Sequence, residues 1–243
     1  MNLREDILMQ VEKPGRYIGN EVNMIVKNPQ SVEIRFAFAF PDVYEVGMSH
    51  LGSSLLYSFL NAREDTYCER VFAPWFDMET HMRRENLPLW ALETGDSVKD
   101  FDFIGFTLQY EMCCSNVVNM LDLAGLQVLA SERGDDAPII IAGGPCAYNP
   151  EPLADIIDVF YIGEGEANLH EILNRYREHK RNGGGKREFL ASILDIEGVY
   201  VPSFYDVSYN QDGTLAALTP NVANAPAAIS KAIVRDLEEL EYP

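Results

Sequence analysis

Short apolar stretches recur along the first two thirds of the chain, and most of them stop at proline or glycine. Val32–Phe40 alternates apolar and polar residues at first and then becomes almost entirely apolar, as in a strand whose far end is buried on both faces. Ala137–Ala142 is the clearest buried strand and leads directly into Gly143. The predicted strands are Val32–Phe40, Cys68–Ala73, Leu87–Leu92 (short), Phe101–Gln109, Ala137–Ala142 and Asp158–Ile162.

Between these stretches, leucine and phenylalanine return every three to four residues, which is helical spacing. Leu51, Leu55 and Phe59 form one such stripe, and Ser49 stands where an N-cap residue is favoured. Asp77 occupies the same position before a more polar helix. The predicted helices cover about residues 51–60, 78–85, 116–124, 167–179 and 187–194.

Strands that alternate with helices at this spacing form a parallel sheet with right-handed crossovers. The sequence therefore predicts an α/β fold, a doubly wound Rossmann-like parallel sheet with a small carboxyl-terminal β-appendage. We expect an amino-terminal extension over residues 1–31, the Rossmann-like domain over 32–180, and a linker, a short helix and two β-segments over 181–228. The acidic tail, residues 229–243, shows no packing stripe and is interpreted as a linker to a further domain.

The net charge of the chain excludes some classes of binding partner. The 243 residues include 38 acidic and 19 basic side chains, a formal net charge of −19, and the excess is spread evenly along the chain. Clustered lysines and arginines hold a nucleic-acid backbone or an anionic membrane surface, so this segment is expected to bind neither. No apolar run approaches the roughly 20 residues that span a bilayer, and the acidic start lacks the core of a signal peptide. We expect a cytoplasmic protein.

The cysteines argue against a metal site. The chain has four, Cys68, Cys113, Cys114 and Cys146, and the Cys-x-x-Cys spacing does not occur. Adjacent helical residues point about 100° apart, so we expect no zinc or iron–sulfur site within this chain. His50, His81 and His179 are isolated in the sequence. Glu166 and His170 stand four residues apart on one predicted helix face, where we expect a surface contact rather than a metal pair. No nucleophile stands with a base in a catalytic pattern. We therefore expect no catalytic residues here.

Candidate chemistry gathers in the loops after the strands, because ligands of open parallel sheets bind beyond the strands' carboxyl ends. The first loop contains Asp42, Tyr44, Gly47 and Met48. It has neither the Gly-x-Gly-x-x-Gly of dinucleotide sites nor the Ser/Thr-rich loop of a flavodoxin-type flavin site. Its spacing matches Asp-x-His-x-x-Gly with Tyr44 in the histidine position. A turn capped by Asp42, with Tyr44 in the core, is the alternative interpretation.

Three later strand ends carry further candidates. Thr107 and Gln109 place a hydroxyl and an amide where they can hydrogen-bond a buried ligand or the loop backbone. Gly143 and Gly144 either allow a flat ligand to approach closely or form a tight turn that Pro145 makes rigid. Carboxylates suit a helix N-terminus but repel phosphate. The third strand end, Gly163-Glu164-Gly165-Glu166, carries two such carboxylates at the start of a predicted helix, so this segment is not expected to bind phosphate.

Taken in order, these loops resemble the cobalamin-binding-type domain that precedes the catalytic barrel in many radical S-adenosylmethionine (SAM) proteins. The pair Gly-Gly-Pro and Gly-Glu-Gly-Glu, separated by one strand, is the most specific part of the pattern. From about residue 12 onward the sequence is similar to one uncharacterised family within that class. The matching segments are Arg16–Gly19, Phe40–Gly52, Arg70–Trp75, Gly105–Glu111 and Ala142–Cys146.

The resemblance implies a place for cobalamin. In the Asp-x-His-x-x-Gly motif the histidine ligates cobalt and the aspartate hydrogen-bonds its other ring nitrogen. Here Tyr44 would lie beneath the corrin as a packing platform and leave cobalt without a protein ligand. The nucleotide tail of the cofactor would pass Thr107 and the pair Gly143-Gly144.

The resemblance also implies a downstream radical SAM barrel, whose three-cysteine motif holds a [4Fe–4S] cluster that cleaves SAM. This chain stops at Pro243 without that motif, so we expect it to be part of a larger enzyme with that barrel as its partner. Two interpretations stay open. The chain presents a corrin to the barrel, for example for methyl transfer, or it is a degenerate Rossmann-like scaffold that binds no cobalamin and shapes the substrate entrance. An independent enzyme, or another nucleotide- or flavin-binding protein, is the third alternative.

Overall fold

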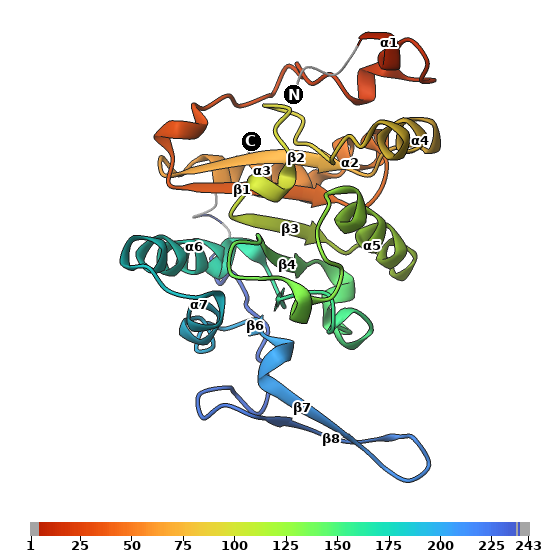
Figure 1. Cartoon of the computed structure of the whole chain (residues 1–243). Coiled ribbons are helices and arrows are strands. Elements are labelled where there is room, and N and C mark those ends of the chain that lie inside the picture. The colour runs from red at the N-terminus through yellow and green to blue at the C-terminus, as the bar shows by residue number, and fades with distance from the viewer. Residues whose placement is uncertain (1–4, 237, 239–243) are drawn as a thin grey trace.

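The computed structural model describes residues 5–236 and 238. Its centre is a six-stranded sheet with the order β2-β1-β3-β4-β5-β6 (Figure 1). The first five strands run parallel, and β6 pairs antiparallel with β5. The strands are β1 Ile34–Phe40, β2 Thr66–Phe72, β3 Phe103–Thr107, β4 Ile139–Gly143, β5 Val159–Tyr161 and β6 Val199–Tyr200. The predicted doubly wound α/β fold is confirmed, and the strand order reverses between β1 and β3.

Helices cover both faces of the sheet. Figure 1 shows α4 and α5 on one side and α6 and α7 on the other, and α3 shares the side of α6 and α7 because its buried residues belong to the same core. No helix in the described part of the chain is both long and apolar enough to cross a membrane. The helices are α1 Glu5–Leu8, α2 Tyr44–Met48, α3 Leu51–Asn61, α4 Phe76–Glu85, α5 Cys114–Leu123, α6 Gly165–Asn182 and α7 Lys186–Ser192.

Alternation along β1 divides the core into two layers. Phe36 and Phe38 belong to the core shared with α3, α6 and α7, whereas Ala37 and Ala39 belong to the core shared with α4 and α5. All four are buried, which explains why the strand loses its polar positions. Burying a phenylalanine side chain contributes roughly 1.5–3 kcal/mol, so this strand is a main source of stability.

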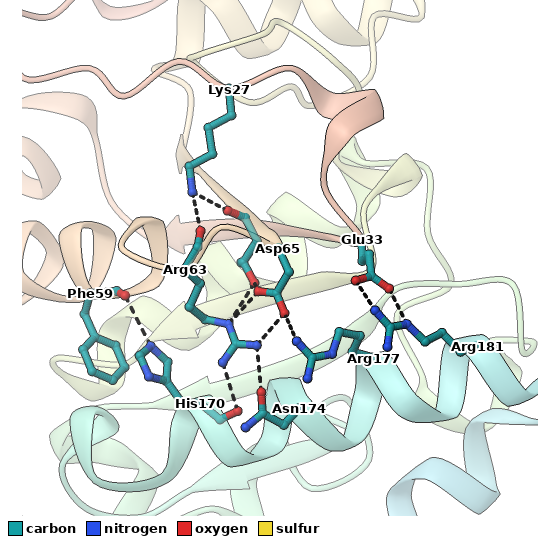
Figure 2. A network of polar contacts seen from close by, with 10 residues as sticks. Lys27, Glu33, Phe59, Arg63, Asp65, His170, Asn174, Arg177 and Arg181 are labelled. Atoms are coloured by element: carbon teal, nitrogen blue, oxygen red, sulfur yellow. Dashed lines mark hydrogen bonds and ion pairs between the residues drawn. The ribbon is translucent and has the colours of Figure 1, made fainter.

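A polar network closes the amino-terminal edge of the sheet next to α6. Figure 2 shows Arg63 and Arg177 converging on the carboxylate of Asp65, with nitrogen–oxygen distances of 2.8 and 2.5 Å. Burial alone would raise the pKa of Asp65, but hydrogen bonds from Arg63, Thr66 and Arg177 outweigh it and hold that pKa at about 2. Lys27 donates to three backbone carbonyl oxygens of the α3–β2 turn at 2.6–2.7 Å. These contacts join the amino-terminal extension, β2 and α6.

The predicted short strand at Leu87–Leu92 is wrong. Trp90 makes one isolated bridge with Ser97, and the backbone amide of Leu89 donates to the carbonyl oxygen of Leu123 at 2.9 Å. Residues 89–92 of this run are nevertheless buried, and Leu87 is half-buried against the same core. The run therefore marks a loop that lines the core, because a short apolar stretch has too few residues to show a period.

Two predicted N-caps are also wrong. The residue before α3 is His50, whose Nδ1 accepts the backbone N–H of Ser53 at 3.1 Å, so Ser49 does not cap the helix. Trp75 occupies the N-cap position of α4, and Asp77 is the second residue of that helix. The carboxylate of Asp77 instead accepts a backbone N–H from the amino-terminal extension.

The carboxyl-terminal region follows the prediction in part. The hairpin of β7 (Tyr205–Tyr209) and β8 (Leu215–Pro220) is the expected β-appendage, and it projects from the body in Figure 1. The tail shows no packing stripe in the sequence, yet its first part packs on the body, since Ala232 is fully buried. Its backbone amide and carbonyl bond Ile162 and Glu164 at 2.9 and 3.0 Å. The end of the tail, at 237 and 239–243, lies outside the described residues.

Candidate functional site

A cavity opens at the carboxyl ends of β3, β4 and β5, between the sheet and the first turns of α3 and α6. Its volume is about 810 Å³, counting the part that is open to solvent. The apolar lining comes mainly from Phe36, Phe38, Leu56, Ile141 and Leu169. The structure brings most of the predicted candidates together here, namely Thr107, Gln109, Gly143, Gly144, Gly163, Glu164, Gly165 and Glu166.

Glycines at the end of β4 keep the cavity open. Side chains alternate along a strand, so a Cβ at Gly143 would stand on the same face as Ile141, which lines the cavity. Its nearest neighbour would be the carbonyl oxygen of Tyr161 at 3.5 Å, an ordinary contact. Gly144 differs, because its φ is +95° and an added Cβ would lie 2.8 Å from the carbonyl oxygen of Leu108. Gly144 is therefore required by the turn, whereas Gly143 leaves space.

The polar part of the lining lies at the end of β3. Thr107 is buried, and its hydroxyl oxygen accepts a hydrogen bond from Gln109 Nε2 at 2.6 Å. The Thr107 hydroxyl hydrogen and the Gln109 carbonyl oxygen then provide one donor and one acceptor. The backbone amide of Leu108 donates to the carbonyl oxygen of Gly143 at 2.7 Å. This bond holds the ends of β3 and β4 together, so the two polar groups have fixed positions.

His50 is a lining residue that the sequence prediction missed. Because its Nδ1 accepts the backbone N–H of Ser53, the proton of the neutral ring is on Nε2. The ring also packs at a tilt against Phe40, with centroids 5.2 Å apart. One signal in the sequence could have identified His50 as a lining residue: it follows a strand end and stands directly before an amphipathic helix. It was not used because histidine is not among the favoured N-cap residues.

The loop after β5 supports the cavity and also holds the chain's own tail. Gly163 has a φ of +126°, and an added Cβ would lie 2.2 Å from the carbonyl oxygen of Ala232. Oε2 of Glu164 accepts the backbone N–H of Val234 at 2.5 Å. Glycine at 163 is thus required by a backbone contact within the protein, and the Glu164 carboxylate already has a partner.

Two of the candidates outside the cavity, Asp42 and Pro145, stand in loops at the same edge of the sheet. The carboxylate of Asp42 accepts hydrogen bonds from the phenol of Tyr110 and, at 2.7 Å, from the backbone N–H of Val43. The bond to Asp42 raises the pKa of Tyr110 to about 12. Pro145 begins a 3-10 turn and is exposed. Asp42 therefore joins the loops after β1 and β3 on the two sides of the point where the strand order reverses.

The rest of the loop after β1 packs toward β2 and the amino-terminal extension. The phenol of Tyr44 donates to Oε1 of Glu21 at 3.1 Å, and its ring contacts Phe72 edge-on with centroids 5.5 Å apart. Burial and the nearby Glu21 carboxylate raise the pKa of Tyr44. A Cβ at Gly47 would lie 2.3 Å from the Phe72 ring, and Met48 lines a separate small crevice with Gly47. These residues do not line the cavity.

The lining indicates the class of ligand. It contains the carboxylates of Glu164 and Glu166 and, among the described residues, no lysine or arginine. Burial raises the pKa of Tyr161 to about 12, so its hydroxyl stays neutral and donates to the carbonyl oxygen of Glu164 at 3.1 Å. In the described ranges no group of three or more His, Cys, Asp or Glu side chains could hold a metal ion. The cavity therefore suits a large ligand with apolar faces and a few hydrogen-bonding groups.

The chain is similar to parts of longer known proteins. The uncharacterized protein MJ0966 of Methanocaldococcus jannaschii is 29% identical over 168 residues, which are 68% of this chain and 28% of that protein. Two structures of the cobalamin-dependent S-adenosylmethionine radical enzyme OxsB, with aqua-cobalamin alone or with S-adenosylmethionine as well, have 14% and 13% identity. Both give a TM-score of 0.43 and cover 93% of this chain and 29% of OxsB. The chain thus spans less than a third of the length of these proteins.

At a TM-score of 0.43, the cofactors of OxsB do not carry over to this chain. The sequence model of the family described as "Radical SAM proteins, N-terminal" matches residues 52–202. That segment is more than half of the chain and runs from the first turn of α3 to just beyond β6. It includes every cavity-lining loop after β2. The chain therefore belongs to the family of radical SAM protein N-terminal domains.

Proposed function

We propose that this chain is the cobalamin-binding module of a radical SAM enzyme and presents the corrin to a catalytic domain in a longer protein. The observation that carries the proposal is the cavity at the carboxyl ends of β3, β4 and β5, where doubly wound sheets bind their ligands. Its residues fit such a cofactor, because the walls are apolar and Gly143 leaves free the space that a side chain would fill. Family membership gives independent support.

Different lining residues would contact different parts of the cofactor. Thr107 and Gln109 would hydrogen-bond the nucleotide tail of the cofactor, and Gly143 and Gly144 would let the tail lie against the backbone. The apolar side chains of β1, α3 and α6 would exclude water from it. Bound cobalamin would supply a cobalt-borne methyl group. The [4Fe–4S] cluster and SAM would be held by the catalytic domain, outside this chain.

The loop after β1 would give cobalt no protein ligand. Tyr44 is hydrogen-bonded to Glu21 and does not line the cavity. A neutral phenol is a poor metal ligand because it ionises only near pH 10 in water, and the pKa of Tyr44 is raised further. In the motif the aspartate orients the cobalt-ligating histidine, and this chain has no histidine at that position. Asp42 is hydrogen-bonded to Tyr110 instead.

The same contacts favour a second candidate function. If the loop after β1 serves only internal packing, the chain is a Rossmann-like scaffold that docks on the catalytic domain and shapes its substrate entrance. The cavity would then hold solvent. Both functions place the radical chemistry outside this chain, so cobalamin binding alone separates them.

The test is a loading experiment on the 243-residue chain and on the complete gene product. Each is mixed with excess hydroxocobalamin and passed through gel filtration, and its visible spectrum is recorded. The proposal predicts retained corrin in about equimolar amount, with the band of the base-off form. Colourless protein in both cases would overturn the proposal and favour the scaffold.

A further inference from the structure

The β7–β8 hairpin has one apolar and one polar face. Val207 stands directly opposite Leu218, and Tyr209 stands opposite Leu215 after an irregularity in the register. Residues directly opposite each other in an antiparallel pair project from the same face, as do residues two apart on one strand. The opposite face carries the pairs Asp206–Thr219 and Ser208–Ala217. Such alternation is typical of a strand pair that buries one face.

This apolar face is uncovered in the described part of the chain. Val207 and Leu218 are 40% and 38% exposed, and Tyr209 and Leu215 are 68% and 58% exposed. All four lie outside the two buried cores, although Tyr205 at the base of the hairpin packs against both. Figure 1 shows the hairpin extending away from the sheet and its helices.

Physical reasons indicate that another surface covers this face. A single two-stranded hairpin is marginally stable in water, and a hydrophobic face needs a further layer to become stable. The neighbouring backbone is anchored, since the phenol of Tyr205 donates to the carbonyl oxygen of Pro226 at 2.8 Å. The hairpin therefore leaves the body from a fixed base and presents its apolar face in a defined direction.

We propose that the apolar face of this hairpin, formed by Val207, Tyr209, Leu215 and Leu218, docks on the catalytic domain that follows this N-terminal domain. The relative MJ0966 is more than three times as long as its matched segment, which is 28% of it, and the family model describes the matched segment of this chain as N-terminal. A catalytic domain that follows it in the same polypeptide is therefore the occupant that we infer. The inference rests on the part of the proposed function that places a catalytic domain after this chain. It does not depend on cobalamin.

The size of the face favours a covalently linked partner over a separate molecule. Stable complexes between separate proteins use roughly 20–30 residues and about 800 Å² on each side, and this face has four side chains. A domain in the same polypeptide binds at a high effective concentration, so a small contact is sufficient. A second copy of the chain would lack that advantage.

Hydrogen exchange measured by mass spectrometry tests the proposal in the complete gene product and in the 243-residue chain. We expect amides of residues 205–220 to exchange at least ten times more slowly in the complete gene product. Leu218→Lys should remove that protection. Ala217→Lys, the matched control on the polar face, should keep it. Both variants of the 243-residue chain should unfold at the wild-type temperature, because both side chains project from an exposed hairpin.

Three results would overturn the proposal. The hairpin exchanges equally fast in both proteins, or Leu218→Lys and Ala217→Lys have the same effect. Alternatively, protection is already present in the 243-residue chain, rises with concentration and accompanies a dimer mass, which would identify a second copy as the occupant. Hydroxocobalamin retention by the 243-residue chain carrying Leu218→Lys is measured in parallel. It should equal that of the wild type, so failure of cobalamin binding is distinguished from failure of docking.

Discussion

Gly143→Val is the substitution that best separates ligand binding from folding. The φ of Gly143 lies outside the left-handed region, and an added Cβ would meet only the carbonyl oxygen of Tyr161, at 3.5 Å. Valine is also favoured in strands. We therefore expect the free energy of unfolding to change by less than about 1 kcal/mol, which a urea titration would show.

Binding should respond differently, because the valine side chain would occupy space that the cofactor needs. Forcing extra methyl groups into a filled site costs roughly 1–3 kcal/mol, which corresponds to a Kd about 5- to 150-fold weaker. Equilibrium dialysis against hydroxocobalamin, with corrin absorbance as the readout, measures this change. The matched control is Gly134→Val, since Gly134 is exposed, lies outside the cavity and has nothing within 4 Å of an added Cβ.

The reasoning is refuted in two ways. If Gly143→Val binds hydroxocobalamin as tightly as wild type and Gly134→Val, the nucleotide tail does not pass Gly143. If Gly143→Val unfolds at much lower urea concentration, the space beside Gly143 is not free, and the assignment of this position to ligand binding is wrong.

Three further predictions concern the contacts around the site. Gly163→Ala should release the tail segment 229–234, which faster amide exchange in that segment would show. It should also destabilise the fold by more than Gly213→Ala, because both glycines have positive φ but only an added Cβ at Gly163 would clash. Backbone strain alone costs about 1–3 kcal/mol, so equal effects of the two substitutions would show that the tail contact is weak. Asp42→Asn should bring the pKa of Tyr110 from about 12 back toward the ordinary tyrosine value, measured by ultraviolet titration; an unchanged titration would exclude their hydrogen bond. Asp65→Asn should lower the free energy of unfolding at neutral pH by roughly 1–2 kcal/mol, after allowance for solvent screening. Because the folded-state pKa of Asp65 is depressed from its ordinary value of 3.8 to about 2, the difference should fade as the pH falls through that window. A difference that stays constant with pH would contradict the network of Figure 2.

The sheet was predictable because its strands are apolar on both faces. Phe103–Thr107 lies within a predicted strand, and Ile139–Gly143 extends one residue beyond the predicted Ala137–Ala142. The burial of parallel strands produces just such continuous apolar runs. Val199–Tyr200 was not predicted as a member of the main sheet, because two residues carry no period. The buried loop at Leu87–Leu92 was mistaken for a strand for the same reason.

The site was predictable only where a general rule connects sequence to space. Thr107 and Gly143 were found because ligands bind at the carboxyl ends of parallel strands. His50 and Leu56 were not predicted as lining residues of the cavity. Strand order decides which helices share one face of the sheet, and the sequence pattern does not show strand order. The spacing of Asp42 and Tyr44 likewise does not show toward which neighbour their side chains turn.

Contacts made by the backbone have the weakest signature in the sequence. Ala232 is held by two backbone hydrogen bonds to the loop after β5, and a single buried alanine gives no periodic stripe in the sequence. Gly163 was recognised as unusual, but its reason, the approach of that tail, depends on a segment almost 70 residues away in the chain.

The central claim is that the cavity beside Gly143 binds cobalamin, and a crystal structure of the 243-residue chain grown with excess hydroxocobalamin tests it most directly. The account predicts electron density for the nucleotide tail between the ends of β3 and β4 and the first turn of α6, within hydrogen-bond distance of Thr107 or Gln109. An empty cavity at saturating hydroxocobalamin, or a corrin bound elsewhere on the chain, would contradict it.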